Sequence, residues 1–278
     1  MSDETTPAAV PHGRFVWHDL RTTDPDAAKA FYAALFGWDI QDVPMPHGTY
    51  RMISDRPADE GGQGLGGIED VPQEGVPAHW LGYVTVSDVD AAAEAATSGG
   101  GQVHMPPTDI PEVGRFSIVA DPSGAVVAPF RSASGDLPEP EGPPTAGQFC
   151  WDELVSTDAA ACEGFYQNLF PWRLESMTMP SGPEMPEFTY HLFKRGEGEA
   201  AKDGAGMLQM PPQAEGPSHW IPYIAVDDVD ALCAKAESLG ACIYKQPDDI
   251  PNMGRFAVLG DPQGATFAVW KNLEQPQG

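Results

Sequence analysis

Four residue types that could carry chemistry stand at strand-like spacing near the start and middle of the first half of this sequence. Trp17 is followed two residues later by Asp19, and His79 precedes Tyr83 by four residues. Residues two or four apart on a β-strand share one face, so each pair would point the same way. A carboxylate, an imidazole and a phenol around one ligand could form an acid–base set. The carboxylate would orient the imidazole, and the phenol would donate to a substrate oxygen.

The second half of the chain repeats this set, with Glu153 two residues after Trp151 and His219 four residues before Tyr223. The predicted catalytic residues are Asp19, His79, Tyr83, Glu153, His219 and Tyr223. The two tryptophans are predicted to contact the ligand as aromatic walls. The alternative is structural: the carboxylates would satisfy backbone groups near strand ends, and the histidines would only begin their strands.

Two arginines also recur, although the chain has only 15 basic against 41 acidic residues. Arg115 and Arg255 each follow a glycine within a matching GRF tripeptide. They could anchor a carboxylate or phosphate of a ligand, because a guanidinium binds such groups with two parallel hydrogen bonds. The alternative is an ion pair with a nearby acid such as Asp109 or Asp121.

An internal repeat supplies the elements that must position these residues. FYAALFGW at residues 31–38 matches FYQNLFPW at 165–172, and the offset of 134 also joins Trp17 to Trp151. From Tyr50 and Tyr190 onward the offset is 140, because six additional residues enter the second copy. These residues, 183–188, lie in a Pro/Gly-rich segment and are predicted to form a loop.

The repeat divides the chain into two predicted domains, at residues 10–131 and 148–272. Residues 132–147, SASGDLPEPEGPPTAG, form the predicted linker. Its prolines stiffen the chain and its acids keep it extended.

Each domain contains a shorter repeat of its own. Residues 13–21 alternate like a strand, Asp24 is a candidate N-cap, and residues 27–35 have helical spacing. The same order restarts with a strand over 79–86 and a helix over 89–97. The sequence therefore predicts an α+β fold in which each domain is βαβββ twice.

These patterns resemble the vicinal oxygen chelate superfamily, which includes glyoxalase I, extradiol dioxygenases and bleomycin-resistance proteins. The resemblance rests on a strand followed by TxDPxxAxxFYxxLFGW, a strand followed by xDVDAxxxxA, and a closing strand after DPxG. It covers residues 14–271 as two tandem glyoxalase-like domains. The resemblance implies that the two modules of each domain form a half-open barrel, a cup that holds a ligand or metal. It does not select one activity, because this fold hosts several unrelated chemistries.

Metal-using members of this superfamily place His, Gln or Glu on the first strand of each module and on the last strand. The matching positions here are Trp17, Leu81 and Ala128 in the first copy and Trp151, Ile221 and Ala268 in the second. None of these side chains suits a divalent cation, so we expect no metal of the family type and no other cofactor. A metal held off-register, by His79 with Asp19 or by His219 with Glu153, is the alternative.

Composition excludes several classes of partner. The formal net charge of −26 repels nucleic acid and anionic membrane surfaces. No apolar run approaches 18 residues, and the N-terminal segment lacks a basic-then-apolar signal pattern, so we expect a cytoplasmic protein. The four cysteines lack CxxC spacing and are expected to be free thiols.

The leading hypothesis is a glyoxalase/bleomycin-resistance-like protein that binds a small molecule and could be an enzyme without the usual metal. A non-catalytic binder that sequesters a toxic or aromatic compound is the second hypothesis. A metal-dependent lyase or dioxygenase with displaced ligands is the third. Tandem duplication favours a pseudo-symmetric monomer, with a dimer as the alternative.

Overall fold

The computed structural model describes residues 12–45, 48–71, 73, 75–135, 139–140, 142–179, 187–196, 198, 201–212 and 214–273. Most of the predicted loop at 183–188, and residues 136–138 and 141 of the predicted linker, lie outside the described part. The domain boundaries given above therefore stay predictions.

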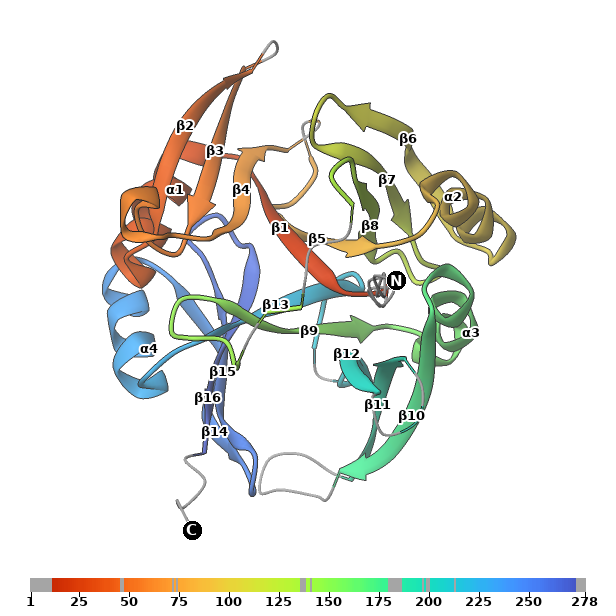
Figure 1. The fold of residues 1–278 in the computed structure, drawn as a ribbon. Helices are drawn as coiled ribbons and strands as arrows, with labels where there is room; N and C mark the ends of the chain where they lie inside the picture. The colour runs from red at the N-terminus through yellow and green to blue at the C-terminus, as the bar shows by residue number, and fades with distance from the viewer. Residues whose placement is uncertain are drawn as a thin grey trace, which may run out of the picture.

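Among the described residues, the strands form two eight-stranded sheets of the same topology, ordered β2-β3-β4-β1-β5-β8-β7-β6 and β10-β11-β12-β9-β13-β16-β15-β14 (Figure 1). The first sheet consists of β1 (Phe15–Thr22), β2 (Asp39–Met45), β3 (Gly48–Ser54), β4 (Gly64–Asp70), β5 (His79–Thr85), β6 (Gln102–Ile110), β7 (Gly114–Ala120) and β8 (Val126–Ser132). The second consists of β9 (Phe149–Ser156), β10 (Trp172–Met179), β11 (Phe188–Arg195), β12 (Lys202–Gln209), β13 (His219–Ala225), β14 (Cys242–Ile250), β15 (Gly254–Gly260) and β16 (Thr266–Asn272). The α+β class and the doubled βαβββ order are confirmed.

The helices are α1 (Pro25–Phe36), α2 (Val89–Ser98), α3 (Ala159–Leu169) and α4 (Val229–Ser238), with a short 3-10 turn η1 (Ala58–Glu60). The predicted N-cap is present: the Asp24 carboxylate accepts from the Ala27 backbone N–H at 3.0 Å, with Pro25 in the first turn. Gly37 ends α1 in the left-handed conformation, at φ 75°. No helix in the described ranges is long and apolar enough to span a bilayer.

Each sheet curves into a U, and the two U shapes stand back to back with their mouths facing away from each other (Figure 1). The two modules of a domain meet at the centre of the U, where β1 pairs antiparallel with β5 and β9 pairs with β13. Neither sheet closes into a barrel, in agreement with the predicted half-open form. The concave face of each U is called cup 1 in the first domain and cup 2 in the second.

The hydrophobic cores behind the cups are shared between the domains. One core joins α1 and the strands around it, including Tyr32, to α4 and the last strands of the chain, including Phe267. A second core joins α2 and its strands to α3, including Tyr166. Tyr32 donates to Asp261 at 3.1 Å and Tyr166 to Asp121 at 2.8 Å, so each aspartate binds the other domain. The two domains therefore interlock through their modules.

A buried histidine–aspartate pair lies between the backs of the two sheets. His18 Nε2 is 2.8 Å from Asp152 Oδ1, and these residues occupy equivalent positions of the repeat, 134 apart. The imidazole stacks on Phe149, whose equivalent in the first copy is Phe15, with ring centroids 4.0 Å apart. Equivalent residues of the two copies therefore meet at the pseudo-two-fold axis.

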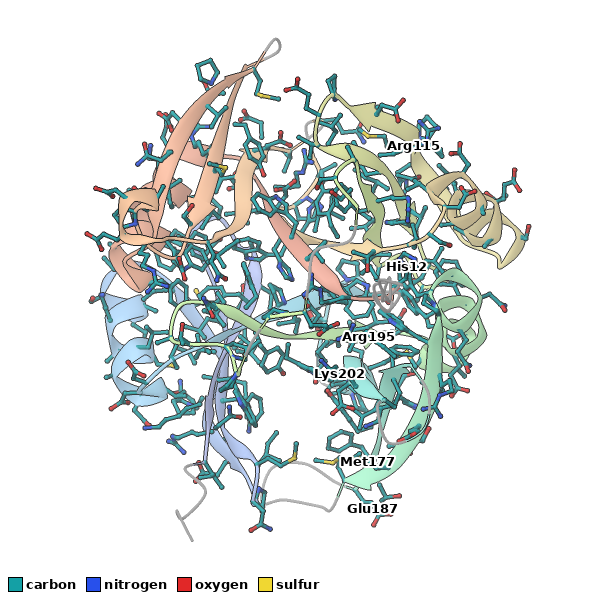
Figure 2. All side chains as sticks on the ribbon, in the orientation of Figure 1. His12, Arg115, Met177, Glu187, Arg195 and Lys202 are labelled. Atoms are coloured by element: carbon teal, nitrogen blue, oxygen red, sulfur yellow. The ribbon has the colours of Figure 1, made fainter. Side chains whose placement is uncertain are left out.

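The predicted linker also docks onto the second domain through Glu139. Its carboxylate accepts from Arg195 at 2.6 and 3.2 Å and from Lys202 at 3.2 Å, and both cations lie on the same side of the second sheet (Figure 2). The Arg195 side chain is 6% exposed and that of Glu139 is 26% exposed, so water reaches this ion pair from the glutamate side.

Candidate functional site

A carboxylate with three hydrogen-bond donors lies at the centre of cup 1. Asp19 Oδ1 accepts from Trp17 Nε1 at 3.0 Å and from the Tyr50 hydroxyl at 2.8 Å. Its Oδ2 accepts from the Tyr83 hydroxyl at 2.7 Å. Asp19 is 4% exposed, and the indole of Trp17 also donates to the Tyr50 oxygen at 2.8 Å. The four side chains form one hydrogen-bonded cluster, in which Asp19 and Tyr83 are buried and Trp17 and Tyr50 are half-buried.

Cup 2 contains the same cluster with a longer acid. Glu153 accepts from Tyr190 at 2.7 Å and from Tyr223 at 2.9 Å, one phenol on each oxygen. The Trp151 indole donates to the Tyr190 hydroxyl at 3.1 Å. The carboxylate and tyrosine of the sequence prediction are thus brought together in both cups, with the predicted tryptophan beside them.

The strand register explains this convergence. Trp17 lies directly opposite Tyr83, and Asp19 opposite Leu81, so the phenol is a diagonal neighbour of the carboxylate on the same face. The equivalent pairs in cup 2 are Trp151 with Tyr223 and Glu153 with Ile221.

The second tyrosine of each cluster, Tyr50 or Tyr190, had no predicted role, although the repeat matched the two. Each phenol lies across a glycine of the neighbouring strand. A Cβ at Gly67 would be 2.1 Å from the Tyr50 hydroxyl, and one at Gly206 would be 1.9 Å from the Tyr190 hydroxyl. The tyrosines that the repeat matched were the available signal in the sequence. That each phenol reaches the carboxylate depends on the glycine of the neighbouring strand over which it lies.

The histidines lie at the other end of the same face and do not reach the carboxylates. His79 lies opposite Arg21, two positions beyond Asp19, and its Nδ1 is 2.9 Å from the Pro77 carbonyl. His219 makes the same contact with Pro217 at 2.9 Å. Burial lowers the pKa of His79, and Arg21 lowers it further. The predicted carboxylate–imidazole pair is therefore not formed in either cup.

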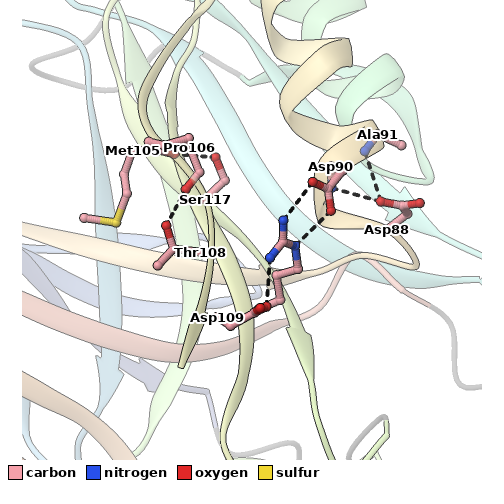
Figure 3. Close-up of polar contacts among 9 residues, drawn as sticks. Asp88, Asp90, Ala91, Met105, Pro106, Thr108, Asp109 and Ser117 are labelled. Carbon is pink, nitrogen blue, oxygen red and sulfur yellow. Dashed lines mark hydrogen bonds and ion pairs between the residues drawn. The ribbon is translucent and has the colours of Figure 1, made fainter. Parts of the chain in front are cut away.

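The recurrent arginines lie outside the cups, against the helices. Arg115 binds both oxygens of Asp90 on α2 at 2.8 Å and Asp109 on β6 at 2.8 Å (Figure 3). Arg255 repeats this with Asp230 at 2.7 and 2.8 Å and Asp249 at 3.0 Å. The carboxylates raise the arginine pKa values and occupy N–H groups that an anionic ligand would otherwise use. For Arg115, the arrangement is the ion pair with Asp109 that was the alternative to a ligand anchor.

Asp121, the other suggested partner of Arg115, has a different place. It closes the turn before β8, accepting from the Ala125 backbone N–H at 3.1 Å, and it binds Tyr166 of the second domain.

Cup 1 holds an ion pair that sequence reasoning did not identify. Arg21 Nη1 contacts Glu69 on β4, and Nη2 is 3.7 Å from Asp19 Oδ2. In cup 2 the register places Val155 opposite Leu208, where cup 1 has Arg21 opposite Glu69. A constant offset of 140 would have matched Glu69 with Gln209, so the repeat register shifts by one residue at this strand.

Burial decides which cluster groups can exchange a proton. Burial, and then the adjacent Asp19, raises the pKa values of Tyr50 and Tyr83, so both phenols stay protonated at neutral pH. Burial also raises the pKa of Glu153, and hydrogen bonds from the two phenols oppose that rise. A carboxylate with a raised pKa is better matched to proton transfer near neutrality than an exposed one.

The side chains do not fit the metal that the fold implies. The family positions on the cup face hold Trp17 opposite Tyr83 and Ala128 beside Tyr83, and neither side chain offers a ligand atom of the required kind. The adjacent Asp19 is hydrogen-bonded to three donors. No group of three or more His, Cys, Asp or Glu residues in the described ranges is arranged to hold a metal ion.

Comparison with known proteins identifies the family. Residues 14–128 and 149–269 each match the Glyoxalase/Bleomycin resistance protein/Dioxygenase superfamily. The chain belongs to this superfamily, as a tandem pair of its domains.

Particular relatives share nearly the whole chain. "Putative glyoxylase CFP32" of Mycobacterium tuberculosis is 39% identical over 267 residues, covering 93% of this chain and 95% of that protein. The anthracycline biosynthesis protein DauV of a Streptomyces species is 32% identical over 275 residues, covering 92% of each. The Mn(II)-bound glyoxalase from Novosphingobium aromaticivorans has the same fold, with a TM-score of 0.60 at 17% identity over 95% of this chain and 83% of that one.

Proposed function

We propose that this chain is a small-molecule-binding member of the superfamily whose cups hold their ligand against the Trp–acid–Tyr–Tyr cluster, without a metal at the family positions. The observation that carries the proposal is the recurrence of this cluster. It comprises Trp17, Asp19, Tyr50 and Tyr83 in cup 1, and Trp151, Glu153, Tyr190 and Tyr223 in cup 2. In both versions the acid is buried and accepts hydrogen bonds from two phenols, although the acids differ in length.

The cluster suits a small molecule that is partly apolar and partly polar. The tryptophan ring and the surrounding apolar side chains of cup 1, including Phe116 and Phe130, supply area for an aromatic or aliphatic skeleton. The Tyr50 and Tyr190 oxygens already accept from the tryptophan indoles. The Tyr223 oxygen retains acceptor capacity after donating to Glu153, so it can receive a hydrogen bond from the ligand. Two relatives are named for anthracycline biosynthesis, which agrees with a small-molecule role.

Proton transfer is the second candidate function, favoured by the environment of Glu153. Its raised pKa and its contact with two protonated phenols would let it accept a proton from a bound substrate while a phenol stabilises the oxygen that gains charge. A protein that only sequesters its ligand would use the cluster for binding and would need no proton transfer by Glu153.

A thermal-shift screen with aromatic small molecules, followed by mass analysis of the products, tests the proposal. We expect hits that raise the melting temperature, and we expect Asp19→Asn or Tyr83→Phe to weaken those that use cup 1. Asp42→Asn is the matched control, because Asp42 pairs with Lys29 on the surface. Hits whose effect is unchanged in Asp19→Asn, Tyr83→Phe, Glu153→Gln and Tyr223→Phe would contradict the proposal.

Product analysis then separates the two candidate functions. Turnover that disappears in Glu153→Gln while binding persists would support proton transfer, and binding without turnover would support sequestration. Metal analysis of protein purified without added metal completes the test. One equivalent of Fe, Ni, Zn or Mn per chain would overturn the metal-free proposal and restore the displaced-ligand alternative.

A further inference from the structure

The two cups differ at one cross-strand pair on the same face as the cluster. Arg21 and Glu69 face each other on β1 and β4 of cup 1. Val155 and Leu208 face each other at the same place in cup 2, packed with the apolar residues of that cup. One cup therefore carries a charged pair where the other is apolar, although the rest of the cluster is shared.

The guanidinium of Arg21 is nearly enclosed, with 16% of its side chain exposed. Nη1 binds Glu69, Nη2 faces Asp19 at 3.7 Å, and the guanidinium also interacts with the Tyr83 hydroxyl. Nε is buried and has no hydrogen-bond partner among the described residues. A buried N–H donor without an acceptor is costly, so a ligand oxygen that reaches Nε when the Arg21 side chain shifts would recover that cost.

The surrounding charges restrict what kind of oxygen that is. Two carboxylates, Asp19 and Glu69, already lie beside the single guanidinium. A ligand carboxylate or phosphate would add a third negative charge in a poorly hydrated place. The oxygen of a ketone or quinone accepts the N–H hydrogen bond without adding charge.

We propose that cup 1 selects an uncharged, carbonyl-bearing aromatic molecule through Arg21 Nε, whereas cup 2 has no such preference. This inference rests on the proposed function, because it assigns a ligand class to one of the two proposed cups.

Three matched probes test the assignment: 1-tetralone, its ketone-free counterpart tetralin, and the anion tetralin-1-carboxylate. We expect tetralone to bind cup 1 about tenfold more tightly than tetralin, the value of one hydrogen bond to a charged donor, and the carboxylate to bind more weakly than tetralone. In a ¹H–¹⁵N spectrum, tetralone is expected to shift the Arg21 Nε–H resonance and tetralin to leave it in place.

The repeat supplies a control for the pair. Arg21→Val with Glu69→Leu gives cup 1 the residues of cup 2, and the preference for tetralone over tetralin should disappear. If this double variant does not fold, the shift of the Arg21 Nε–H resonance in the wild-type protein still tests the inference. Equal binding of tetralone and tetralin, an unmoved resonance, or tighter binding of the carboxylate would overturn the inference and leave the proposed function standing. Failure of all three probes to bind either cup would count against both.

Discussion

The acids at the centres of the two cups illustrate how one side chain sets the chemistry of a site. Asp19 in cup 1 shares its surroundings with Arg21, whereas Glu153 in cup 2 has only phenols as close polar partners. Desolvation therefore dominates at Glu153 and raises its pKa. Equivalent residues of the repeat thus have different electrostatic environments.

Glu153→Gln is expected to stabilise the fold at neutral pH while impairing function. Because the folded pKa of Glu153 lies above its unfolded value, folding favours the protonated acid. The stability that this group contributes is complete below the unfolded pKa and is lost as pH rises through the folded one. Glutamine imitates the protonated acid, so we expect a gain of about 1 kcal/mol at pH 7. Urea unfolding should show the gain shrink toward pH 4; a loss of stability at pH 7 would contradict this account.

At the scale of elements, the clusters depend on how closely β3 approaches β4 and β11 approaches β12. Tyr50 can cross β4 only because residue 67 is glycine, and Tyr190 crosses β12 at Gly206 in the same way. The cup therefore needs a missing side chain on one strand as much as a polar side chain on the next.

Gly67→Ala should displace Tyr50 and weaken the cluster. The added methyl group would overlap the phenol, so we expect a loss of about 1–3 kcal/mol in the free energy of unfolding. Gly164→Ala in α3 is the matched control. No atom lies within 4 Å of a Cβ there, and replacing a helical glycine should increase stability by about 0.5–1 kcal/mol. Unfolding curves would show both; equal effects of the two substitutions would refute the steric explanation.

The elements themselves were predictable because their signals are local. The N-cap at Asp24 and the alternation of residues 13–21 depend on neighbours in sequence. The repeat shows each of these signals a second time. The contacts around the cups were harder to predict from the sequence. Whether His79 faces Asp19 or Arg21 depends on cross-strand register, and the pairing of Arg21 with Glu69 depends on a one-residue shift between the copies.

At the scale of the whole molecule, the domains that the repeat defines in sequence are not the units that share a core. Phe267 of the second domain packs with Phe31 and Tyr32 of the first, with ring centroids 6.4 and 5.6 Å apart. The interior therefore joins opposite ends of the chain, and the domains should unfold together.

Phe267→Ala tests this cooperativity. We expect one unfolding transition in urea for both proteins, with the free energy of unfolding lowered by about 3–5 kcal/mol in the variant. Circular dichroism and tryptophan fluorescence should report the same midpoint. Two separate transitions, with only one moved by the substitution, would show that the domains are independent.

The linker contact predicts a loss of stability in acid. Hydrogen bonds from Arg195 lower the pKa of Glu139 to about 2. Because the folded pKa is depressed, the contribution is present above the unfolded value and is lost as pH falls from there through about 2. We expect Glu139→Gln to cost about 1–2 kcal/mol at pH 7 and only a small part of that at pH 2, as measured by thermal unfolding. A deficit that persists at pH 2 would assign the effect to packing.

The contact between His18 and Asp152 bears on which halves can pair with each other. A position that lies on a two-fold axis meets its own copy when two identical chains associate. Two separate copies of the first half would there bring imidazole against imidazole, and two copies of the second would bring carboxylate against carboxylate. Only unlike halves can place an acid opposite a base at this point. The difference between His18 and Asp152 therefore favours pairing of each half with the other over pairing of either half with a copy of itself.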